Sequence, residues 1–134
     1  MRAYCDGASR GNPGPAAMAF KILDENGAVV KKSSKFLGKR TNNEAEYEAL
    51  VAALESASRL TSGRVDCLLD SELVVRQLKG EYRIRSPRLK GLWLKVRETQ
   101  QCFQNVSFTH VPRTDKNIEE VDELANSVLN RVVG

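Results

Sequence analysis

The chain has 134 residues, of which 41% are hydrophobic and 28% are charged, and its formal net charge is +4 at pH 7. These values are typical of one globular domain, residues 1–134, that buries a sizeable core. No apolar run approaches the ~20 residues that cross a membrane, and the start resembles a strand rather than a signal peptide. The three cysteines lack metal-ligand spacing, so we expect core thiols in a cytoplasmic protein.

The first third of the chain predicts three strands. The first runs to about Asp6 and is followed by a turn-rich loop over residues 7–15. Residues 16–23 and 28–37 form the next two, joined by a hairpin at 24–27 whose Asn-Gly pair suits a tight turn. Hairpin-length connections make consecutive strands antiparallel neighbours.

The remainder predicts alternating helices and strands. Thr41 and the two asparagines after it offer N-cap side chains for a long helix that ends near Leu60. The other expected elements are strands ending at about Asp70 and covering 106–110, and helices over 71–78, 87–101 and 117–132. This order predicts an α/β fold: a five-stranded mixed sheet, three antiparallel strands then two parallel, with helices on both faces.

Four acids stand where folded proteins usually place apolar or neutral side chains. Asp6 and Asp70 end apolar strands, and Glu46 and Asp122 lie on the apolar stripes of two helices. Unpaired buried acids are costly, and acids that share a site raise one another's pKa. Helix capping or the helix dipole would explain one first-turn acid equally well. For four acids together, a site for divalent cations is the better explanation.

A basic segment, residues 79–97, holds seven Lys or Arg residues against Glu81 alone, a local charge of +6. A basic surface beside an acidic centre suits a polyanionic substrate, although many charge runs are merely solvated. Trp93 lies here on a helical stripe with Leu89 and Val96, which favours core packing over base stacking.

Four segments, in order, resemble ribonuclease HI, and the match covers essentially the whole chain. They are Asp6–Pro15, Thr41–Tyr47, Asp70–Val74 and Val121–Ala125. The resemblance implies a ribonuclease H-like fold with the four acids as its catalytic, metal-binding set. It implies endonucleolytic cleavage of the RNA strand of RNA–DNA hybrids, leaving 5′-phosphate and 3′-hydroxyl ends.

Carboxylates without a nearby cysteine or histidine cluster favour Mg²⁺, with Mn²⁺ as an alternative, over zinc. Two such ions activate water and neutralise charge on the reacting phosphate. We expect Asp6 to bridge both ions, Glu46 and Asp70 to ligate on one side, and Asp122 to complete the second site.

Substrate contacts are expected from loops. Asn12, Asn42 and Asn43 offer side-chain amides, and backbone N–H groups after Thr41, at the helix start, can bind phosphate. In the family these positions touch the minor groove and ribose hydroxyls. Helix capping is the competing explanation for Asn42 and Asn43, and we expect one of them to do only that.

Many bacterial relatives carry a histidine in a glycine-flanked loop before the last catalytic acid. Here residues 111–116 contain neither a histidine nor a glycine, and the only histidine of the chain, His110, ends a strand. We therefore expect Arg113, rather than His110, to approach the scissile phosphate.

Two further departures concern spacing. The interval from Asn117 to Asp122 is one residue longer than in the family, which leaves Glu120 and Glu123 as alternatives to Asp122. Residues 79–101 are too few for the basic helix and loop that some members insert. The chain thus resembles the compact subset, and we expect weaker, salt-sensitive binding.

Other functions remain to be weighed against this one. A non-catalytic module that binds hybrid or double-stranded RNA on the same fold would be expected to lack at least one acid, and all four are present. A different nuclease or strand-transfer activity, or a structural domain, has less support. The expected partner is an RNA–DNA hybrid rather than a membrane, with a monomer as the active unit. The sequence leaves open whether double-stranded RNA is also cut.

Overall fold

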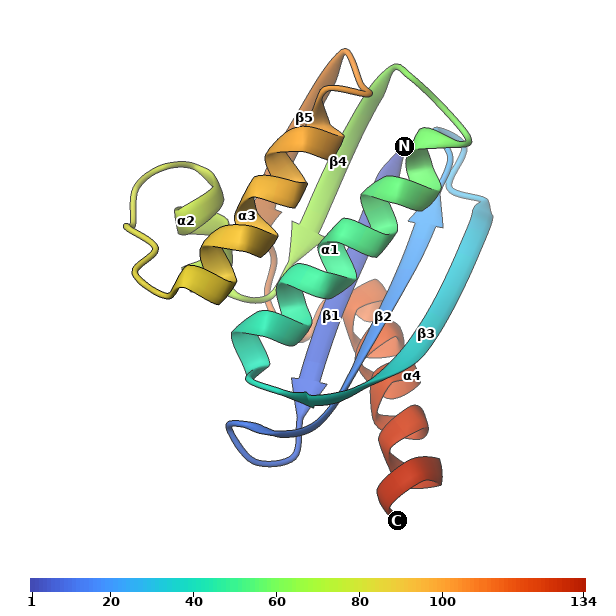
Figure 1. The fold of residues 1–134 in the computed structure, drawn as a ribbon. Helices are drawn as coiled ribbons and strands as arrows, with labels where there is room; N and C mark the ends of the chain where they lie inside the picture. Colours follow the sequence, from blue (N-terminus) through green and yellow to red (C-terminus); the bar gives the residue numbers. More distant parts are fainter.

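The computed structural model describes residues 1–134 as five strands and four helices (Figure 1). These are β1 (Arg2–Ser9), β2 (Gly14–Leu23), β3 (Val29–Arg40), α1 (Asn42–Ser58), β4 (Arg64–Leu69), α2 (Glu72–Leu78), α3 (Pro87–Gln100), β5 (Asn105–His110) and α4 (Lys116–Val133). The strand order is β3-β2-β1-β4-β5. β1, β2 and β3 pair antiparallel, whereas β4 pairs parallel with both β1 and β5. The expected mixed α/β sheet is confirmed.

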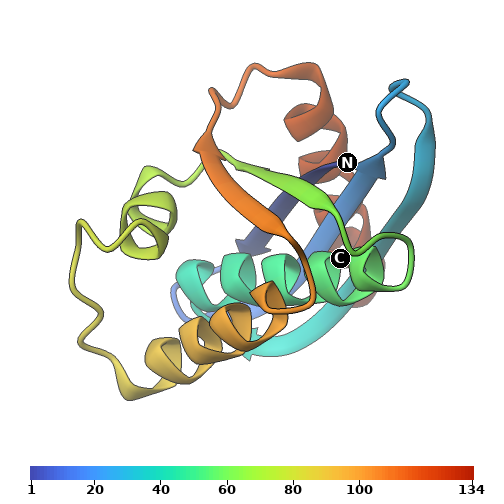
Figure 2. The same cartoon turned by 90° about the horizontal axis from the view of Figure 1, so that it is seen from above.

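Helices cover both faces of the sheet, as Figures 1 and 2 show. One core cluster joins the sheet to α1, α2 and α3, and a second joins the opposite face to α4. Alternation along β1 sends Ala3 and Cys5 into the first cluster and Tyr4 into the second. None of the helices combines the length and apolar character needed to cross a bilayer.

β1 differs from the prediction because it continues beyond Asp6 to Ser9. Its pairing with β4 is recorded only as far as Tyr4, whereas its pairing with β2 extends to Ser9 opposite Ala16. β1 and β4 therefore separate just before Asp6. This separation leaves Asp6 at an opening in the sheet, near the end of β4.

Gly7 permits a close contact between β1 and α1. A Cβ atom added to Gly7 would lie 2.3 Å from the carbonyl carbon of Ala45 and 2.4 Å from the backbone nitrogen of Glu46. Both neighbours are backbone atoms of a packed helix, so they cannot move aside locally. A side chain at Gly7 would displace α1 from β1 next to Asp6 and Glu46.

We expect Gly7→Ala to destabilise the protein by about 1–3 kcal/mol and to reduce activity more than this loss explains. Gly91→Ala is the matched control, because nothing lies within 4 Å of its added Cβ in α3. It should instead stabilise the protein by up to about 1 kcal/mol. Urea denaturation of both variants measures this difference. Equal stabilities would contradict the proposed close contact.

Candidate active site

The four predicted acids come together although they belong to different parts of the chain. Asp6 lies in β1, Glu46 in α1, Asp70 directly after β4 and Asp122 in α4. All four line one cavity of about 400 Å³, together with Gly7, Ala8, Ser9, Asn42, Arg113 and Asn126. The structure therefore places every sequence-predicted carboxylate in a single polar cavity.

Two of these carboxylates are buried without full hydrogen bonding. Asp6 is 3% exposed, and Asp6 Oδ2 and Glu46 Oε2 have no hydrogen-bond partner. Burial, followed by the neighbouring Asp70 and Asp122, raises the pKa of Asp6 to about 9. Burial is also the main cause that raises the pKa of Glu46 to about 7, partly offset by Ser71 and Arg113. Such oxygens are suited to a cation, which would supply the missing partner.

The donor set fits hard divalent ions that keep much of their water. No three of the Asp, Glu, His or Cys side chains of the chain stand close enough together to hold one ion. Mg²⁺ commonly takes only one or two carboxylates, with water and substrate phosphate as its other ligands. The separation of the acids therefore suits Mg²⁺ better than an ion that needs an all-protein cage.

The register of the last acid follows from the surroundings of α4. Asp122 lines the cavity, whereas Glu120 forms an ion pair with Lys21, a buried lysine of β2. Glu123 is exposed and does not line the cavity. The geometry thus favours Asp122 over both alternatives. The Lys21–Glu120 pair also holds the first half of α4 against the sheet.

The asparagines at the start of α1 have a different role from the expected one. Thr41 is the N-cap: its Oγ1 accepts from Glu44 N–H at 3.1 Å, and Glu44 Oε1 accepts from Thr41 N–H at 2.8 Å. The expectation that Asn42 or Asn43 serves only as a cap is therefore wrong. Thr41 precedes the helix and reaches the free N–H groups, while both asparagines lie within the first turn.

Asn42 instead connects α1 to the loop after β1. Its Oδ1 accepts from both the backbone N–H and the hydroxyl of Ser9, at 2.9 and 3.0 Å, and its own N–H donates to Asn12 Oδ1 at 3.0 Å. These bonds use the amide oxygens of Asn12 and Asn42. Their amide N–H₂ groups remain able to donate to a substrate.

His110 and Arg113 lie at different sites. His110 lines a different cavity beside α2, whose lining includes none of the four acids. Arg113 lines the acid cavity, and its Nε donates to Asp70 Oδ2 at 3.1 Å. The structure therefore favours Arg113 for contact with a substrate phosphate.

Asn126 is a cavity residue that the sequence reasoning missed. Its side-chain amide donates to the Asp122 carbonyl at 3.0 Å, one turn earlier on α4. The available signal was its position four residues after Asp122, on the same helix face.

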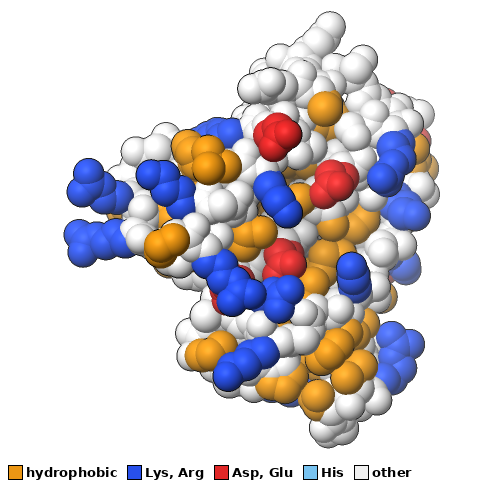
Figure 3. All heavy atoms as spheres, in the orientation of Figure 1, with side chains coloured by type: hydrophobic (Ala, Val, Ile, Leu, Met, Phe, Trp, Pro, Cys, Tyr) orange, Lys and Arg blue, Asp and Glu red, His pale blue; other side chains and the backbone are white.

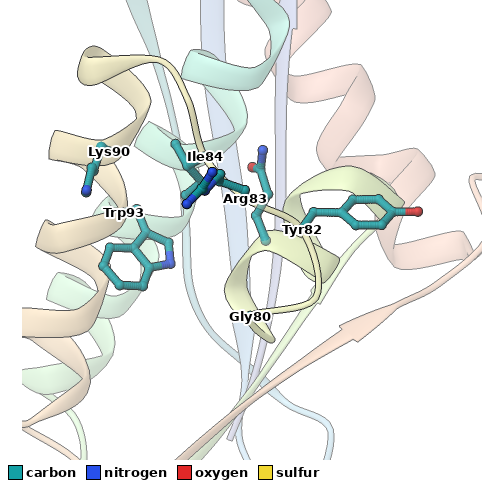
Figure 4. A pocket seen from close by; sticks show the side chains of 7 residues that line it. Gly80, Tyr82, Arg83, Ile84, Lys90 and Trp93 are labelled. Atoms are coloured by element: carbon teal, nitrogen blue, oxygen red, sulfur yellow. The ribbon is translucent and has the colours of Figure 1, made fainter.

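The basic segment forms a surface over α3 and the loop before it, where Figure 3 shows lysine and arginine side chains gathered. Trp93 packs against the first core cluster, with Arg97 4.9 Å from its ring centroid, as the core-packing interpretation predicts. Trp93 also lines a cavity of about 210 Å³ with Arg83 and Lys90 (Figure 4), and none of the four acids belongs to this cavity.

Fold and cavity together define a protein of the ribonuclease H-like class. The family described as "Reverse transcriptase-like" matches residues 4–128, and the chain belongs to this family, within its ribonuclease HI members. Ribonuclease HI of Halobacterium salinarum is 42% identical over 130 residues, which cover 97% of this chain and 64% of that protein.

Solved structures agree with this assignment. The crystal structure of RNase H1 from Halobacterium salinarum matches with a TM-score of 0.92 and 41% identity, covering 98% of both chains. LC11-RNase H1, solved in complex with an RNA/DNA hybrid, matches with a TM-score of 0.91 and 37% identity, covering 99% of both. A bifunctional protein of Mycobacterium tuberculosis is 34% identical over 126 residues, or 93% of this chain. The chain spans 64% of the full halobacterial relative and 34% of the mycobacterial one.

Proposed function

We propose that this chain cleaves the RNA strand of RNA–DNA hybrids endonucleolytically, leaving 5′-phosphate and 3′-hydroxyl ends. The observation that carries the proposal is the convergence of four carboxylates from four elements in one cavity, with two buried oxygens unpartnered. The similarity to LC11-RNase H1, solved with an RNA/DNA hybrid, supports the choice of substrate.

The proposed cofactor is a pair of Mg²⁺ ions, with Mn²⁺ as an alternative. Asp6, Glu46, Asp70 and Asp122, which line the cavity together, would hold these ions, with water and substrate phosphate as further ligands. When bound, the ions supply an activated water and neutralise charge on the reacting phosphate. The Lys21–Glu120 pair holds the first half of α4, and thereby Asp122, against the sheet.

A second cavity, of about 320 Å³, is suited to contact the DNA strand of the hybrid. Its lining includes Thr41 and Ser86, the N-caps of α1 and α3, together with Arg88. Helix N-termini and arginine attract phosphate. Arg88 already pairs with the buried Glu44 at 2.8 Å, which fixes one side of the cavity. We propose that this cavity takes a DNA-strand phosphate, while Asn12, Asn42 and Asn43 face the minor groove.

Cleavage of labelled substrates tests the proposed function. In Mg²⁺ we expect the hybrid to be cut, with single-stranded RNA and duplex DNA intact and all cleavage lost in EDTA. A double-stranded RNA arm decides whether that substrate is also cut. Binding of the hybrid without cleavage would instead establish the non-catalytic module. Cleavage that persists in EDTA would contradict the metal-dependent mechanism.

Two proposals about the setting remain. Cys5 and Cys67 are free, buried thiols as expected, whereas Cys102 is exposed and does not belong to the core. The two buried thiols support the proposal of a reducing, cytoplasmic environment. A monomeric active unit stays a prediction.

A further inference from the structure

Arg113 is presented to the acid cavity by a short, anchored turn between β5 and α4. The Val111 N–H donates to the Leu69 carbonyl at 2.9 Å, and the Asp115 N–H donates to the Pro112 carbonyl at 3.0 Å. Asp115 then caps α4 by accepting from the N–H groups of Asn117 and Ile118. The backbone around Arg113 is therefore held on both sides, and the freedom that remains belongs to its side chain.

The guanidinium of Arg113 serves as a counter-charge for the cavity. Its partner Asp70 has a side chain that is only 9% exposed, whereas the Arg113 side chain is 81% exposed. Asp70, and more weakly Asp122 and Asp6, raise the pKa of Arg113. Arg113 is thus an exposed cation that faces the carboxylates of Asp70, Asp122 and Asp6, which otherwise lie close to one another.

The Arg113 Nε–H occupies one lone pair of Asp70 Oδ2, and the positive charge of the guanidinium repels a divalent ion that approaches the same carboxylate. Mutual repulsion among the acids falls when a cation is present, whichever cation that is. The long side chain of Arg113 can swing outwards without unfolding the turn, because most of its surface already contacts solvent.

From this geometry we infer that Arg113 competes with a divalent ion for Asp70, so that the guanidinium moves away from this carboxylate as the ion binds. Released Arg113 is then free to bind the phosphate of the substrate. Arg113 thus has two successive partners, first the Asp70 carboxylate and then the substrate phosphate. The inference deepens the proposed function, since it rests on Asp70 being a metal ligand.

Calorimetric titration of Mg²⁺ into substrate-free protein, at fixed pH and ionic strength, tests this exchange. We expect Arg113→Gln to bind Mg²⁺ about fivefold more tightly than the wild type. Arg10→Gln is the matched control: Arg10 donates to the Asn126 carbonyl and to the side chain of Asn130 on α4, but to no acid. Its affinity should stay within about twofold of the wild type, which separates release of Asp70 from a general change of charge.

Two more readouts complete the test. In the wild type, the NMR resonance of the Arg113 Nε–H should move towards its solvent-exposed position as Mg²⁺ saturates. In hybrid cleavage, Arg113→Gln should lower kcat about tenfold despite its tighter Mg²⁺ binding. A merely structural role would weaken both properties together.

Equal Mg²⁺ affinities in the wild type and Arg113→Gln, or an Nε–H resonance that does not respond to Mg²⁺, would overturn the exchange. If the wild type nevertheless cleaves hybrid in Mg²⁺, the proposed function stands and only the inference fails. A wild type that neither binds Mg²⁺ nor cuts hybrid would overturn both.

Discussion

Asp70→Asn is expected to lower hybrid cleavage by about a thousandfold or more while the protein stays folded. The amide keeps the size of the carboxylate and can still accept a hydrogen bond from Arg113, but it loses the charge that a metal ligand needs. Asp70 lies directly after β4, outside both hydrophobic clusters, so its replacement removes no apolar contact. Initial rates on a labelled hybrid, with circular dichroism of the same sample, measure the two effects separately.

The same assay decides which residue of α4 is the catalytic acid. Asp122→Asn should match the loss seen for Asp70→Asn, because both side chains line the acid cavity. Glu123→Gln is the matched control, one residue away and exposed, and should keep activity within about twofold. A large loss in Glu123→Gln with little loss in Asp122→Asn would show that the last acid is misassigned.

Much of this site could be predicted from sequence because its acids interrupt apolar patterns. Glu46 and Asp122 fall on helical stripes, and Asp6 and Asp70 follow apolar strand residues, so each acid had to face either the core or a cavity. That argument places each acid on a face of its own element. It does not supply the distance between elements, which depends on where β1 and β4 separate.

Side-chain partners far apart in the chain could not be predicted. Lys21 lies within an otherwise apolar strand, which signals a buried charge in need of a partner. Its partner, Glu120, lies 99 residues away, and only the packing of α4 on β2 brings the two together.

The cap of α1 was ambiguous for a different reason. Thr, Asn and Asn are all good N-caps, and the backbone geometry at Thr41 decides among them.

The metal-free protein is expected to lose stability as the pH rises from about 5 to 9, and Mg²⁺ is expected to reverse this loss. The pKa of Glu46 is raised to about 7 and that of Asp6 to about 9. In the unfolded chain both acids lose their protons near pH 4. Between these values the folded protein binds more protons than the unfolded chain, so the free energy of unfolding falls with rising pH. Below about pH 4 both acids contribute their full stabilisation. The contribution of Glu46 is lost as the pH rises to about 7, and that of Asp6 as it rises to about 9.

Metal binding becomes stronger as the pH rises, because it requires the ionised carboxylates. Saturating Mg²⁺ should therefore raise Tm more at pH 8 than at pH 6. The carboxyl groups with lowered pKa values, Glu44, Asp66 and Glu120, change charge below this range and leave the comparison undisturbed. Thermal unfolding in EDTA and in Mg²⁺ across this pH range measures both trends.

Asp6→Asn tests whether the buried carboxyl group of Asp6 destabilises the metal-free protein. The variant removes the most strongly shifted acid and keeps its shape, so in EDTA at pH 8 its Tm should exceed that of the wild type by about 5 °C. Its response to Mg²⁺ should largely disappear, together with hybrid cleavage. A variant that is less stable than the wild type in EDTA at pH 8 would show that Asp6 stabilises the metal-free fold. The acids would then not be the source of instability that a bound cation relieves.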